Sequence, residues 1–260
     1  MIQHEFANRA KSILTRDDNV IGLAAGGSFI TNEIDEFSDL DLILVTKTKV
    51  SGDRILMLDY AKRLGHFLSG FTGEHVGEPR VLICLYDNPL LHVDIKFLLL
   101  EEFHTRIETP ILLIDKDGQL ENAISNTQAK YPYPDYQYIE DRFWIWIHYA
   151  LQKIGRGEYF EAYDFFGFLR MAVFGPLLHM KNGNLPRGLR RVEGELSSPD
   201  LNKLKQTIPF YNRQSLLDAL RSTVALYLEL RKVLFDHNVQ WQTNTESSVM
   251  KYFEHIENRK

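Results

Sequence analysis

Apolar and polar residues recur with two different periods along the chain, and the change falls near residue 135. Before it, short apolar runs and alternating stretches predict strands at 20–25, 39–44, 80–86, 90–100 and 111–115, with helices at 2–14 and 51–68. After it, apolar residues three and four apart predict helices at 140–154, 159–181 and 214–235. Residues 181–200, which hold several glycines and prolines, are predicted to be a connector.

The change of period predicts two domains. Residues 131–135 include two prolines, which do not continue a helix or a central strand, so the boundary is placed there. The sequence therefore predicts an α+β protein: a mixed β-sheet with helices along one side in residues 1–134, followed by an α-helical bundle in residues 135–260.

A glycine turn follows the first predicted strand. The apolar run 20–25 stops at Gly26, Gly27 and Ser28. Glycine lets the backbone approach a ligand closely, and free backbone N–H groups at such a turn suit phosphate oxygens. The alternative is an ordinary turn from strand to helix, capped by the serine.

Three aspartates are predicted to share one face of the sheet. Asp39 and Asp41 alternate with leucines on one strand, and Asp94 alternates with apolar residues on another, flanked on its own face by His92 and Lys96. Converging carboxylates repel one another unless cations lie between them, which is how Mg²⁺ is held together with nucleotide phosphates. The alternative is a solvated strand face, on which His92 and Lys96 are partly exposed polar neighbours.

The glycine turn and the three aspartates, in this order and spacing, resemble the polymerase-beta-like nucleotidyltransferase superfamily. The resemblance covers about the first hundred residues. It implies transfer of a nucleoside monophosphate from a nucleoside triphosphate to a hydroxyl. In this reading Gly26, Gly27 and Ser28 bind the triphosphate, and the aspartates bind two Mg²⁺ ions.

The helical half looks like the second domain of small-molecule nucleotidyltransferases of the aminoglycoside and lincosamide resistance type. The resemblance rests on a Trp-rich helix, Lys153, the break at Arg156-Gly157-Glu158 and a following Phe-rich helix. It implies that Lys153 contacts triphosphate and that Glu158 or Glu161 approaches the acceptor. Asp94 and Glu158 are then the candidate general bases for the acceptor hydroxyl. Ion pairs at helix ends explain the same residues as well.

Composition sets the remaining expectations. The 260 residues carry a net charge of −5, which argues against a nonspecific DNA or RNA binder. The sequence has no apolar run long enough to cross a membrane, and its N-terminus does not read as a secretory signal, so we expect a cytoplasmic protein without a membrane partner. The single cysteine, Cys84, lies in an apolar strand and is expected to pack in the core.

The predicted function is thus Mg²⁺-dependent transfer of a nucleoside monophosphate, AMP from ATP in the first instance, to a small hydroxyl-bearing molecule. An aminoglycoside is one candidate acceptor, although the helical half lacks the acidic excess that suits a polycation. The alternatives are an enzyme that nucleotidylates protein or tRNA, as toxin-type relatives do, and a noncatalytic nucleotide-binding relative. The acceptor, the nucleobase and the oligomeric state stay open.

Overall fold

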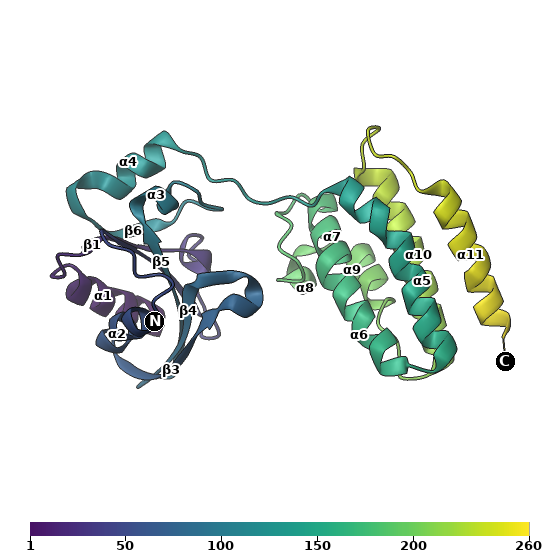
Figure 1. Cartoon of the computed structure of the whole chain (residues 1–260), viewed down its shortest axis with the longest axis horizontal. Helices are drawn as coiled ribbons and strands as arrows, with labels where there is room; N and C mark the ends of the chain where they lie inside the picture. Colours follow the sequence, from purple (N-terminus) through teal and green to yellow (C-terminus); the bar gives the residue numbers. More distant parts are fainter. Residues whose placement is uncertain (260) are drawn as a thin grey trace. The chain divides into compact units, whose positions relative to one another are not determined.

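The computed structural model describes residues 1–259, and the chain divides into two compact units (Figure 1). The first unit is Met1–Tyr131, and the second begins at Pro132. The division therefore falls in the proline-containing segment in which the sequence places the boundary, a few residues before position 134. Each unit has its own core and is described by itself.

A six-stranded mixed sheet forms the centre of the first unit, in the order β3-β4-β5-β2-β1-β6. Its strands are β1 (Val20–Ala25), β2 (Leu40–Thr46), β3 (His66–Gly73), β4 (Glu78–Asp87), β5 (Leu91–Leu99) and β6 (Ile111–Asp115). The neighbours β2 and β5 are parallel, and the other four pairs are antiparallel. The predicted mixed sheet is confirmed, and β3 is an edge strand that the sequence pattern did not predict.

Helices lie on both faces of this sheet, so the predicted placement along one side is wrong (Figure 1). On one face, α1 (Ile2–Leu14) and α2 (Arg54–Arg63) pack on apolar residues of β1, β2, β4 and β5. Cys84 is part of this core, as predicted. On the other face, α3 (Leu100–Phe103) and α4 (Gln119–Asn126) cover a smaller apolar cluster that includes Val45 and Leu98.

The second unit is a helical bundle, as predicted. Its elements are α5 (Tyr136–Arg156), α6 (Tyr159–Leu169), a π-helical segment (Arg170–Phe174), α7 (Gly175–Lys181), α8 (Val192–Glu195), α9 (Ser198–Lys205), α10 (Arg213–Leu234) and α11 (Thr243–Asn258). Its core includes Phe143 and Trp144 of α5, both fully buried. The Trp-rich helix is thus used mainly for packing. Within residues 1–259, none of the helices combines the length and apolar character that a bilayer span requires.

Several predicted boundaries are corrected by tertiary contacts. The helix predicted at 51–68 ends at Arg63, because the following residues join the sheet as β3. The helix predicted at 159–181 is interrupted at 170–174, just before Pro176, which has no N–H to continue an α-helical ladder. The predicted connector 181–200 contains α8 and the first residues of α9.

Candidate active site

The parallel pairing of β2 with β5 places two of the predicted carboxylates side by side. Asp41 and Asp94 are Cα partners in the register of these strands. Residues Leu40 and Leu42, on either side of Asp41, point into the core beneath the sheet, so the Asp41 side chain projects from the opposite face. Asp39 lies two positions before Asp41, at the entrance to β2. All three aspartates are half-buried.

Asp94 is engaged by a neighbour on its own strand. Its Oδ1 lies 2.8 Å from Nε2 of His92, a largely exposed side chain. Burial raises the pKa of Asp94 above its ordinary value of 3.8; His92 opposes that rise, and the negative charge of Asp39 adds to it. The charge of Asp39 thus acts on Asp94, and this region of the sheet favours additional positive charge.

The glycine turn is built against Asp41. The N–H of Gly26 donates to the backbone carbonyl of Asp41 at 3.0 Å, and the chain then enters a single 3₁₀ turn, Gly27–Phe29. Gly27 has a φ of +59°, and a Cβ on it would collide with Oδ2 of Asp41. The left-handed backbone therefore favours glycine at position 27, and a side chain there would also have to displace the Asp41 carboxylate.

Glu108 completes this turn, and the sequence analysis did not identify it. Its Oε1 accepts a 2.8 Å hydrogen bond from the N–H of Gly27. A Cβ on Gly26 would lie 2.8 Å from the same oxygen. Glu108 lies in the loop between α3 and β6, where no periodic pattern marks it, so its approach to Gly27, 81 positions earlier, could be found only in the folded chain.

Lys96, the other predicted neighbour of Asp94, belongs to an ion-pair network. Its Nζ lies 2.8 Å from Oε2 of Glu78, whose carboxylate also accepts two hydrogen bonds from Arg80 at 2.7 Å each. The hydrogen bonds from Arg80, together with Lys96, lower the pKa of Glu78 to about 2. The sheet surface next to the aspartates therefore carries both signs of charge, and the basic groups are held in place.

The carboxylates are neighbours, but they do not form a closed metal site. Among residues 1–259, no group of three or more histidine, cysteine, aspartate or glutamate side chains is arranged so that it could hold a metal ion. One oxygen of Asp94 is directed to His92. Carboxylate oxygens are the ligands that Mg²⁺ prefers, so the chemistry of this donor set fits the ion, whereas the side-chain orientations would have to change.

The predicted residues of the second unit form a separate cluster at the break between α5 and α6. Lys153 Nζ lies 2.9 Å from Glu158 Oε2 and 2.9 Å from Glu161 Oε2, and the Tyr149 hydroxyl is hydrogen bonded to Glu161. Hydrogen bonds to Glu158 and Glu161 raise the pKa of Lys153. The structure therefore shows the ion pairs that the sequence offered as the alternative explanation of Lys153 and Glu158.

An aromatic hollow adjoins this cluster. It has a volume of about 420 Å³ and is lined by Ile145, Trp146, Tyr149, Phe165 and Phe168. Tyr149 belongs to both the hollow and the charged cluster. This arrangement joins an apolar surface, suited to the flat face of a ring, to a set of charged and hydroxyl groups.

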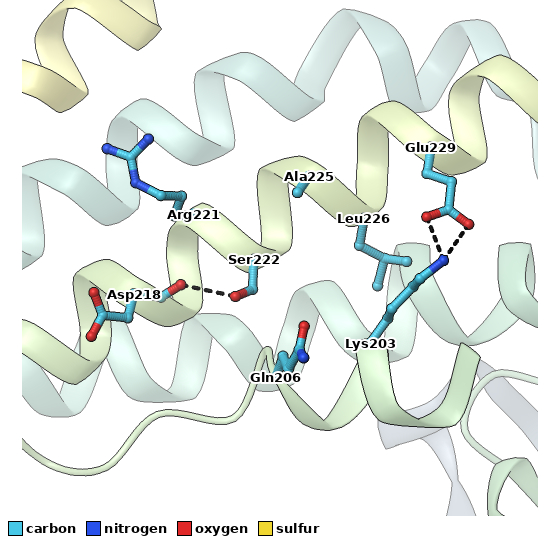
Figure 2. Close-up of a pocket in the computed structure, with 8 residues that line it drawn as sticks. All are labelled: Lys203, Gln206, Asp218, Arg221, Ser222, Ala225, Leu226 and Glu229. Atoms are coloured by element: carbon cyan, nitrogen blue, oxygen red, sulfur yellow. Dashed lines mark hydrogen bonds and ion pairs between the residues drawn. The ribbon is translucent and has the colours of Figure 1, made fainter. Parts of the chain in front are cut away.

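A second hollow, of about 370 Å³, lies over α9 and α10 in the same unit (Figure 2). Its charged side chains are engaged: Lys203 contacts both oxygens of Glu229, and Arg221 pairs with Glu257. The Ser222 hydroxyl donates to the backbone carbonyl of Asp218. These pairs stabilise packing between helices, and the hollow contains none of the predicted site residues.

Comparison with known proteins finds similar solved structures but no similar protein family. No protein-family model matches the chain, and no curated protein matches it significantly. An aminoglycoside 6-adenyltransferase from Bacillus subtilis is 16% identical, with a TM-score of 0.43 over 100% of this chain and 98% of that one. A nucleotidyltransferase-like protein from Exiguobacterium sibiricum 255-15 is 11% identical, with a TM-score of 0.36 over 96% of this chain and 89% of that one.

A spectinomycin adenyltransferase from Enterococcus faecialis, solved with ATP and spectinomycin, is 13% identical, with a TM-score of 0.32 over 98% of this chain and 99% of that one. Two of these three proteins are adenyltransferases and the third is a nucleotidyltransferase-like protein. With identities of 16% or less and TM-scores of 0.43 or less, these likenesses carry no argument about this chain, so the function proposed below rests on the residues of the site.

Proposed function

We propose that this protein is a Mg²⁺-dependent nucleotidyltransferase that transfers a nucleoside monophosphate, AMP from ATP in the first instance, to a hydroxyl of a small molecule. The observation that carries this proposal is the pairing of Asp41 with Asp94 next to a glycine turn that is kept open at Gly27. A solvated strand face accounts for single aspartates. It does not account for a left-handed glycine beside one of these carboxylates, where a Cβ would collide with the Asp41 side chain.

In the proposed donor site, Asp39, Asp41 and Asp94 hold Mg²⁺. Two bound ions would neutralise phosphate charge and activate the attacking oxygen. To bind Mg²⁺, Asp94 would give up its contact with His92. Gly26, Gly27 and Ser28 hold the triphosphate through their backbone and the serine hydroxyl.

The proposed acceptor site uses the second unit. The aromatic hollow at Trp146 and Phe168 binds an apolar ring face of the acceptor, and the polar groups at its edge select the substituents. Glu158 is one candidate to take the proton of the acceptor hydroxyl, and Asp94 is the other. Lys153 and Arg156, which lies 3.8 Å from Glu158, together balance the charges of Glu158 and Glu161, and we propose that Lys153 also contacts triphosphate. Because these charges are balanced, a polycationic aminoglycoside is a candidate acceptor without being a required one.

The proposal is tested by a transfer assay. The protein is incubated with each α-³²P-labelled nucleoside triphosphate, Mg²⁺ and a panel of hydroxylated small molecules that begins with aminoglycosides and spectinomycin. We expect a labelled product and an equal amount of pyrophosphate with one donor. Transfer should be lost in Asp41→Asn and Asp94→Asn and retained in Asp59→Asn, which removes an exposed aspartate of α2. Transfer that persists in Asp41→Asn would contradict the proposed site.

A further inference from the structure

We propose that Glu108 is an internal competitor for the donor site: in the protein without nucleotide, its carboxylate occupies a position that a phosphate of the donor takes when it binds. This inference rests on the proposed function. Its central observation is the 2.8 Å hydrogen bond from the N–H of Gly27 to Oε1 of Glu108. The glycine turn therefore already binds an anion, and that anion belongs to the protein.

The turn is shaped to admit this carboxylate. A Cβ on Gly26 would lie 2.8 Å from Glu108 Oε1, closer than real Cβ contacts allow, so the absence of a side chain at position 26 leaves the space that the carboxylate fills. Carboxylate and phosphate oxygens are alike in carrying negative charge and in accepting hydrogen bonds from backbone N–H groups. One N–H cannot make a strong, linear hydrogen bond to both at once.

The segment that carries Glu108 is anchored at its ends and open in its middle. Arg106 donates to two backbone carbonyls at the end of α4, at 3.1 and 2.6 Å, and Pro110 is buried. Between them, Ile107 and Thr109 are exposed. The Glu108 side chain can therefore leave the turn without removing an apolar residue from the core.

Glu108 also places a negative charge on the Gly26–Gly27 turn, where the triphosphate is proposed to bind. The donor triphosphate must displace Glu108 from the N–H of Gly27. If the Glu108 side chain stayed in place, the phosphates would have to approach its negative charge. Loss of the Glu108 carboxylate should therefore strengthen the binding of polyphosphate by about tenfold, the effect expected when one charge-assisted hydrogen bond no longer has to be broken. The opposite role, in which Glu108 holds the turn in its binding conformation, predicts weaker binding.

Titration calorimetry with inorganic tripolyphosphate and Mg²⁺ distinguishes these roles without requiring turnover. The proteins are wild type, Glu108→Gln, Glu108→Ala and Glu101→Gln, which removes an exposed carboxylate of α3 outside the turn. We expect both Glu108 variants to bind about tenfold more tightly and Glu101→Gln to stay within about twofold of wild type. Urea unfolding checks that each variant is folded.

The outcomes separate the inference from the function on which it rests. If wild type binds and the Glu108 variants bind equally or more weakly, Glu108 is not a competitor, and the proposed donor site stands. If neither wild type nor the variants bind tripolyphosphate, both the donor site and the role of Glu108 are contradicted. A gain in affinity as large in Glu101→Gln as in the Glu108 variants would show a general charge effect and would also overturn the inference.

Discussion

Asp41 on β2 and Asp94 on β5 occupy directly paired positions in the one parallel strand pair of the described sheet, residues 20–115. Side chains at paired positions of adjacent strands lie on the same face and only about 5 Å apart. Two carboxylates at this separation repel each other, and like charges directly opposite destabilise a sheet. The pairing therefore carries a cost from like charge, which the contact of Asp94 with His92 offsets in part and which a bound cation would reduce further.

The first prediction concerns Gly27. Alanine at this position would be strained by the φ of +59°, and its Cβ would collide with the Asp41 side chain. We expect Gly27→Ala to lose about 1 kcal/mol or more of unfolding free energy and to weaken Mg²⁺-dependent triphosphate binding. Urea unfolding and calorimetry measure the two effects.

Gly77→Ala is the matched control for this prediction. Gly77 has a φ of +76°, and a Cβ there would meet nothing within 4 Å. Gly77→Ala should therefore reproduce the loss of stability that comes from the backbone conformation and leave triphosphate binding unchanged. Equal loss of triphosphate binding in the two variants would show that the collision with Asp41 is not the reason why Gly27→Ala binds more weakly.

The second prediction separates the two candidate bases. Glu158→Gln should lower kcat by about a hundredfold or more, since general-base catalysis contributes at least that much, while the Kd for Mg²⁺-triphosphate stays the same. Asp94→Asn should lower kcat and raise this Kd, because it removes a proposed metal ligand. Glu254→Gln, an exposed glutamate of α11, serves as the control. Unchanged kcat in Glu158→Gln would leave Asp94 as the base and assign Glu158 to the ion pair with Lys153.

The third prediction is a pH dependence of stability that arises from Glu78. Its pKa in the folded protein is about 2, against an ordinary value of 4.5, so the carboxylate stabilises the folded state above pH 4.5. This contribution is lost as the pH falls from 4.5 toward 2. Because Glu78 is partly exposed, we expect it to be worth about 1 kcal/mol after screening.

Urea unfolding of wild type and Glu78→Gln between pH 7 and pH 3 tests this dependence, since the contributions of the other carboxylates cancel in the difference. The difference in unfolding free energy should be largest at pH 7 and shrink steadily below pH 4.5. A difference that does not change with pH would show that the ion pairs with Arg80 and Lys96 do not lower the Glu78 pKa.

The fourth prediction concerns a buried charge in the second unit. Glu140 is fully buried and accepts hydrogen bonds from the Tyr227 hydroxyl, from Arg231 at 3.2 Å and from the N–H of Gln242 at 3.0 Å. Arg231→Met leaves this carboxylate without its cation, which should cost about 3 kcal/mol. In the double variant Arg231→Met/Glu140→Gln, much of that loss should be recovered.

Arg221→Met gives the comparison for an exposed ion pair. Arg221 is half-exposed and pairs with Glu257, so its removal should cost less than about 1 kcal/mol. Equal losses in Arg221→Met and Arg231→Met, measured by urea unfolding, would contradict the account of Glu140 as a buried carboxylate that depends on its partner.

The sequence predicts the part of the site that lies on regular strands. Leucines alternate with Asp39 and Asp41, and apolar residues alternate with Asp94, which indicates which side chains share a face. In the structure, Asp41 and Asp94 occupy paired positions of β2 and β5. The parallel register also depends on the long connection between β2 and β5. No local pattern encodes this register, so only the folded structure gives it.

The features that the sequence did not predict depend on contacts between distant segments. Strand β3 has a glycine at its centre, Gly70, and lies at the sheet edge, where one neighbour is enough and alternation is weak. The π-helical segment precedes Gly175, where a Cβ would collide with the backbone of Gly188, so a tertiary contact and Pro176 together shape this part of the helix. Glu108 reaches Gly27 from an irregular loop.

The most direct test of the central claim is a thermal unfolding titration with ATP, GTP, CTP and UTP, each with and without Mg²⁺. The proteins are wild type and Asp39→Asn/Asp41→Asn. We predict that one triphosphate at about a hundred times its Kd raises the Tm of wild type by about 5 °C or more, only with Mg²⁺, and that the double variant does not respond. No Mg²⁺-dependent shift with any of the four triphosphates would contradict a donor site at Asp39, Asp41 and Asp94.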